Sequence, residues 1–199
     1  MRTIAEDDFL RLLAEKGIGL HPKYPKSRAL DFAAGSESRF WQVPPEPERR
    51  PYFLATLIDL MGDWENCYVW RHLGAWPTPE PSDHDRINDA VERQILRGVR
   101  IPLGTNAIVG FDEDERDGLI TLLFSTTVFG WSQPDDLQVV PNHGRSILHT
   151  DHHGVVHVTF PLGGELQAWV TKMAEEGFDL PEELPDSTFK RPSWMRKNP

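Results

Sequence analysis

Residues 119–160 read LITLLFSTTVFGWSQPDDLQVVPNHGRSILHTDHHGVVHVTF, and the predicted fold is organised around this stretch. Apolar and β-branched runs alternate with turn residues, which is typical of short strands joined by tight connections. We therefore predict an antiparallel β-meander over about residues 105–160. Its first hairpin should pair NAIVGF (106–111) with GLITLLF (118–124) across an acidic loop, since Asp117-Gly118 supplies turn chemistry.

Three further strands of the meander are expected at residues 137–140, 146–149 and 153–160, where turn residues bound each apolar run. The last two should pair antiparallel around Thr150–His152. Because side chains alternate between the two faces of a strand, His153 and His157 share one face. The opposite face should point into the core and carries Val156, Val158 and Phe160.

Four helices are predicted to pack on this sheet, at residues 4–16, 51–61, 83–97 and 165–176. The first follows a capping-box pattern, with Thr3 as N-cap and Glu6 three residues later. The second begins at Pro51, a residue suited to the first turn of a helix. The last carries an apolar stripe at helical spacing and should be buried through Leu166, Trp169, Val170 and Met173.

These patterns together predict a single α+β domain over residues 1–186, followed by a basic C-terminal tail at 187–199. A chain of 199 residues can bury a core of its own, and 39% of its residues are hydrophobic. A further strand is expected at 66–73, which is aromatic and β-branched. Two other runs, ALDFAA (29–34) and SRFWQV (38–43), fit either short strands or loop.

Net charge limits the classes of partner. The chain carries 21 basic and 31 acidic residues, a formal charge of −10, while the tail at 187–199 holds four basic residues and no acid. Such a chain repels phosphate backbones, so we expect no nucleic-acid partner and instead a protein partner of basic character. No run of 18 apolar residues is present, and the N-terminus lacks the apolar segment of a secretory signal. We expect no membrane association and a cytoplasmic location.

A histidine-rich hairpin is the candidate metal site. His149, Asp151, His153 and His157 lie at the end of one predicted strand, in the turn and in the next strand. Neutral imidazoles with one carboxylate are a ligand set for Zn²⁺ or a similar ion. The spacing matches no complete zinc motif, and histidines also occur on the wet faces of strands. A metal-dependent hydrolase or metal-binding protein is therefore the alternative functional hypothesis, with Zn as its cofactor.

The leading functional hypothesis is a non-enzymatic binding protein without a cofactor. The sequence carries no P-loop, dinucleotide fingerprint or G-x-S-x-G motif, and Cys67, the single cysteine, is expected to be buried in a strand. Exposed tryptophans are common interface anchors, and the acidic segment fails the EF-hand pattern but offers an anionic contact surface. A small inhibitor or immunity protein that neutralises a cationic partner fits these features. Its predicted contact residues are Trp76, Asp112, Glu113, Asp114, Glu115 and Trp194.

Overall fold

The computed structural model describes residues 2–22, 29–72, 94, 97–98, 108–129, 136–151 and 154–181. Within them, a seven-stranded sheet and a two-stranded sheet pack with four α-helices, which confirms the predicted α+β fold. The predicted helix at 83–97 lies outside the described residues, apart from Gln94 and Arg97, which are helical. The tail at 187–199 also lies outside them. None of the described helices is both long and apolar enough to span a bilayer.

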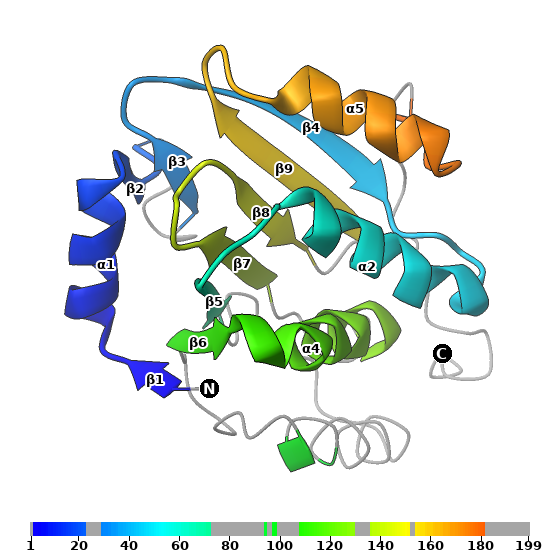
Figure 1. The fold of residues 1–199 in the computed structure, drawn as a ribbon, viewed down its shortest axis with the longest axis horizontal. Coiled ribbons are helices and arrows are strands. Elements are labelled where there is room, and N and C mark those ends of the chain that lie inside the picture. The colour runs from blue at the N-terminus through cyan, green and yellow to red at the C-terminus, as the bar shows by residue number, and fades with distance from the viewer. Residues whose placement is uncertain are drawn as a thin grey trace, which may run out of the picture.

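The main sheet has the strand order β1-β6-β5-β7-β8-β9-β4, and every neighbouring pair is antiparallel (Figure 1). Strands that are consecutive in the chain pair over β7, β8 and β9 and between β5 and β6, whereas β6 and β7 do not pair because β5 lies between them. Their bounds are β1 (Arg2–Ile4), β4 (Ser36–Gln42), β5 (Asn66–His72), β6 (Ile108–Asp112), β7 (Asp136–Pro141), β8 (Ile147–Thr150) and β9 (Val155–Pro161).

Most predicted strands are confirmed. The strands expected at 66–73, 137–140, 146–149 and 153–160 correspond to β5, β7, β8 and β9, and β8 pairs antiparallel with β9 as predicted. The two runs left open between strand and loop form β3 (Leu30–Phe32) and β4. The prediction of a single uninterrupted meander is wrong, because β6 pairs with β5 on one side and with β1 on the other.

The predicted strand at 118–124 is wrong, since this run lies inside helix α4 (Arg116–Phe129). Asp112 ends β6 and starts a capping box: its side chain accepts a backbone N–H from Glu115, whose carboxylate accepts the Asp112 N–H. A 3₁₀ turn, η2 (Glu113–Glu115), leads directly into α4. The apolar run therefore continues as a buried helix, with Leu119, Leu122 and Leu123 each no more than 1% exposed.

Helix α1 (Glu6–Glu15) is confirmed, but its predicted N-cap is wrong. The N-cap position is Ala5, which makes no side-chain hydrogen bond, whereas Thr3 lies in β1 opposite Val109. Pairing with the sheet edge takes Thr3 out of reach of the helix. The first turn instead carries three acids, which the positive end of the helix dipole stabilises: Glu6, Asp7 and Asp8.

One face of the main sheet is covered by three helices, α2 (Arg50–Leu60), α4 and α5 (Leu166–Glu175), which lie in front of it in Figure 1. Trp169 of α5 is 3% exposed and meets Phe160 of β9 edge to face, with 5.4 Å between ring centroids. Leu166 and Met173 are buried as predicted, whereas Val170 is only partly buried. This face is the larger core of the molecule.

The second face is covered by α1 and by the small hairpin of β2 (Ile18–Leu20) and β3. Phe9 of α1 meets Trp70 edge to face, with ring centroids 5.6 Å apart. The hairpin is fastened to the sheet by a buried hydrogen bond, in which the backbone N–H of Leu30 donates to Gln138 Oε1 at 2.6 Å. This cover lies over β5, β6 and β7 and extends to Ile147 of β8, and it leaves a polar region around His149 of β8 and His157 of β9.

Candidate functional sites

The polar region of the second face contains three neighbouring rings on adjacent strands. His149 of β8 lies directly opposite His157 of β9, and their rings stack with centroids 5.7 Å apart at an angle of 28°. Phe40 of β4 lies opposite His157 on the other side, with its centroid 6.1 Å from the imidazole. The cross-strand register therefore brings both histidines together on one surface, as the alternation of β9 predicted for His157.

Two carboxylates face these imidazoles. Asp136 Oδ2 lies 3.8 Å from His149 Nε2, and Asp151 Oδ2 lies 3.5 Å from His157 Nε2. Leu137 of β7 lies opposite Thr150 of β8, and Asp136 and Asp151 are the next residues outward from this pair. The two aspartates therefore lie at the same end of the neighbouring strands β7 and β8. We refer to the four residues Asp136, His149, Asp151 and His157 as the histidine–aspartate cluster.

The cluster is partly open to solvent. The side chains of His149 and His157 are 30% and 34% exposed, and those of Asp136 and Asp151 are 20% and 16% exposed. Asp151 is also held in place by its turn, because its Oδ1 accepts the backbone N–H of Val155 at 3.0 Å. Each imidazole thus has a positioned carboxylate on one side and solvent access on another.

Three of the four predicted metal ligands, His149, Asp151 and His157, meet in this cluster, and the fourth, His153, lies outside the described residues. Sequence reasoning missed Asp136. The available signal was its position two residues before Gln138 on the same face of β7, but the register between β7 and β8 is not visible in the sequence. As the side chains stand, no group of three or more described His, Cys, Asp or Glu residues is close enough to hold a metal ion.

A second candidate site lies where the end of α2 meets the start of α4. Seven acidic side chains are exposed there, and we refer to them as the acidic corner. They come from α2, the loop that follows it, and the η2 segment with the first turn of α4. The residues are Asp59, Asp63, Glu65, Asp112, Glu113, Asp114 and Asp117.

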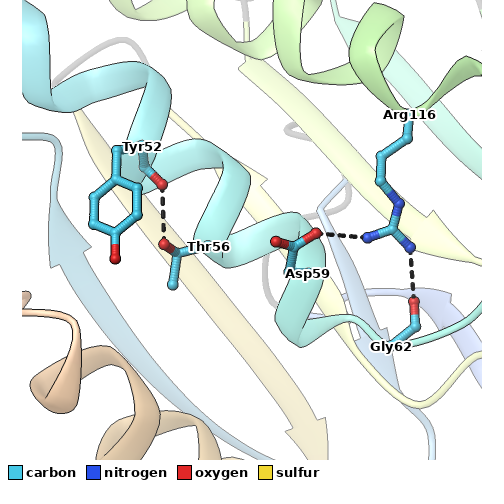
Figure 2. Close-up of polar contacts among 5 residues, drawn as sticks. All are labelled: Tyr52, Thr56, Asp59, Gly62 and Arg116. Carbon is cyan, nitrogen blue, oxygen red and sulfur yellow. Dashed lines mark hydrogen bonds and ion pairs between the residues drawn. The ribbon is translucent and has the colours of Figure 1, made fainter.

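The corner is fixed by Arg116, which links its two halves (Figure 2). Its guanidinium forms an ion pair with Asp59 at 2.8 Å and donates to the Gly62 carbonyl at 3.2 Å. The same group lies over the Trp64 ring, 5.2 Å from the ring centroid. Arginine suits this role because its planar fork can donate to two acceptors while stacking on an aromatic ring.

The other end of the α2–α4 pair is tied in the same manner. Arg50, at the start of α2, donates to the carbonyls of Pro44 and of Thr127 near the end of α4, both at 2.9 Å. Within α2, the Thr56 hydroxyl donates back to the Tyr52 carbonyl at 2.9 Å (Figure 2). The acidic corner therefore stands on two helices that are held together at both ends.

The predicted contact residues divide into three groups. Asp112, Glu113 and Asp114 are exposed at the acidic corner, although they start a helix and are not the tip of the predicted hairpin. Glu115 is partly buried, and its carboxylate serves in the capping box. Trp76 and Trp194 lie outside the described residues.

Cys67 is fully buried in β5, as predicted. Desolvation by burial raises the pKa of the Cys67 thiol far above its usual value, and the nearby Arg116 only partly offsets this rise. A thiol in this environment stays protonated and does not act as a nucleophile.

Comparisons with protein-family models, with curated proteins and with solved structures find no match to the chain.

Proposed function

We propose that this chain is a non-enzymatic protein-binding module that receives a cationic protein on its acidic corner, as a small inhibitor or immunity protein does. The observation that carries the proposal is the gathering of seven exposed carboxylates on a rigid frame. Arg116 and Arg50 donate hydrogen bonds that link α2 to α4. Asp59 is paired with Arg116, and the other six carboxylates of the corner present negative charge outward.

The physical effect of such a surface is on encounter rate and on partner choice. Like charges gathered on one surface raise the local potential, which accelerates association with a partner of opposite charge and repels partners of the same charge. Because the corner is tied at both ends of the α2–α4 pair, little conformational entropy is lost when a partner docks. The net charge of −10 acts in the same direction at longer range.

The test uses the full chain as bait and two variants matched in charge. D63N/E113Q/D114N removes three carboxylates from the acidic corner, and E15Q/E165Q/D179N removes three exposed carboxylates elsewhere. A protein captured from an extract of the source cells is purified and titrated against all three baits at several salt concentrations. The partner should be basic, and the corner variant should bind it about tenfold more weakly or worse, since three rim charges together contribute on the order of 1.4 kcal/mol.

The control variant should bind within about twofold of the wild type at physiological salt, where charges far from the contact are screened. Equal weakening by both variants would show that only overall charge matters. Unchanged binding by the corner variant would show that the contact lies elsewhere. Either result contradicts the proposal.

A metal-dependent hydrolase is the second candidate function, and the histidine–aspartate cluster is the specific observation that favours it. Imidazole and carboxylate groups on one partly exposed face are the groups with which proteins hold a catalytic zinc ion. Hydrolysis requires that the cluster bind such an ion first, and this requirement is tested below independently of any partner.

A further inference from the structure

We propose that the histidine–aspartate cluster is a binding site for a divalent transition-metal ion of the Zn²⁺ class, with His149, His157, Asp136 and Asp151 as its ligands. The proposal is independent of the protein-binding function, because the cluster lies on the second face of the sheet and the acidic corner lies at the end of α2 and α4 on the first face.

The first observation is the length of the two imidazole–carboxylate contacts. At 3.5 Å and 3.8 Å, they exceed the 2.7–3.2 Å of a direct N–H···O hydrogen bond, so neither pair is closed in that way. Ligands that lie about 2.0–2.1 Å from a tetrahedral zinc ion are separated from each other by about 3.3–3.4 Å. The His157–Asp151 contact already has nearly this length, and the His149–Asp136 contact is slightly longer.

The second observation is the direction in which the imidazole nitrogens and the carboxylates face. Both Nε2 atoms face a carboxylate, and the stacked rings are within 28° of parallel. The two carboxylates stand on neighbouring strands at the same end of the sheet. The two nitrogens and two carboxylates therefore line one end of the polar region. Side-chain rotations that bring the four groups toward a common centre would complete an N₂O₂ set without moving the strands.

The third observation is the chemical class of the four groups. The cluster offers two imidazoles and two carboxylates, which are ligand types of divalent transition metals. Two nitrogen ligands favour zinc, nickel, cobalt or copper over magnesium and calcium, which prefer oxygen ligands alone. The partial exposure of both histidines gives an ion a path of entry from solvent.

The experiment is a calorimetric titration of the full chain, stripped with a chelator, with ZnCl₂ and separately with MgCl₂. We expect one zinc ion per chain at this site and no comparable uptake of magnesium. H149Q and H157Q should each weaken zinc binding by about tenfold or more, because second-shell changes alone typically cost 10–100-fold. Circular dichroism of each variant verifies that it is folded.

The matched control is H21Q. His21 pairs with Asp31 at the same 3.5 Å and with similar exposure, but the pair belongs to the β2–β3 hairpin. Zinc affinity in H21Q should stay within about twofold of the wild type. The proposal is overturned if the wild type takes up no zinc, if magnesium binds equally well, or if the H149Q/H157Q double variant keeps stoichiometric zinc. Loss of zinc binding with unchanged partner binding would leave the proposed function intact.

Discussion

Two rows of residues on the same strands show how the faces of the main sheet differ. On the first face, four residues lie opposite one another on adjacent strands, and each is no more than 1% exposed. They are Val69 of β5, Val139 of β7, Leu148 of β8 and Val158 of β9. One residue along each strand, the second-face row grades from a buried aromatic through a buried amide to two partly exposed imidazoles. That row is Trp70, Gln138, His149 and His157.

Residues that stabilise the core and residues that could do chemistry are therefore separated by the alternation of side chains along the strands, and not by regions of the chain. The first row is apolar throughout because α2, α4 and α5 cover it, whereas α1 and the β2–β3 hairpin cover only the Trp70 end of the second row. Neighbouring residues therefore differ in role: Leu148 is part of the core, and His149 belongs to the polar region.

The largest effect is expected on the first face. Trp169→Ala should lower the free energy of unfolding by about 3–5 kcal/mol, because it removes a buried aromatic and leaves a cavity against Phe160. Equilibrium unfolding in urea measures this change, with the Phe160 side of the contact tested by Phe160→Leu. A loss below about 1 kcal/mol for Trp169→Ala would show that α5 is not an integral cover of this face.

A smaller effect is expected at Gln138, where the second row passes from core to polar surface. Gln138→Ala should cost about 1–3 kcal/mol, because the buried N–H of Leu30 then loses its acceptor. Urea unfolding again gives the value. Gln42→Ala, at a partly exposed position of β4, is the control and should stay within about 0.5 kcal/mol of the wild type. Equal effects of the two substitutions would contradict the fastening role of Gln138.

The two capping-box patterns give the next test. Asp112→Ala should cost about 1 kcal/mol, because Asp112 caps the turn that starts α4. Thr3→Ala should change stability by less than about 0.5 kcal/mol, since Thr3 is an exposed residue of the edge strand β1. Thermal unfolding of both variants makes the comparison. A larger loss at Thr3 than at Asp112 would reverse the assignment of the caps.

These two patterns also show how far the sequence predicts the fold. T-I-A-E at Thr3 and D-E-D-E at Asp112 have the same capping-box spacing, and only the second is used. The local pattern cannot decide between them, because the choice depends on whether the strand ends at that residue or continues past it. Both residues have strand partners, since Thr3 lies opposite Val109 and Asp112 lies opposite Asn66. Asp112 is the last residue of β6, whereas β1 continues through Ile4 after Thr3.

The apolar run from Leu119 to Phe124 was ambiguous for a related reason. A short run of apolar residues is compatible with a buried strand or a buried helix, and its neighbours decide which forms. Periodicity predicted the isolated strands and helices well, including the face of β9 that carries His157. It could not predict that β5 inserts between β6 and β7, nor that Asp136 joins the histidines, because both follow from pairing between distant segments.

The smallest effect is expected at His149, and it completes the comparison of the two rows. In the metal-free protein, His149→Gln should change the free energy of unfolding by less than about 0.5 kcal/mol, because the side chain is 30% exposed and its contact with Asp136 is long. Leu148→Ala, one residue earlier and fully buried on the first face, should cost about 2–5 kcal/mol. Urea unfolding of the two variants in the presence of a chelator measures both changes.

If His149→Gln proved as costly as Leu148→Ala, the second row would be part of the core, and the partial exposure of its imidazoles would carry no functional meaning. If the cost appeared only when zinc is added to the wild type, it would report the free energy of ion binding, because a ligand that binds only the folded chain stabilises it by mass action.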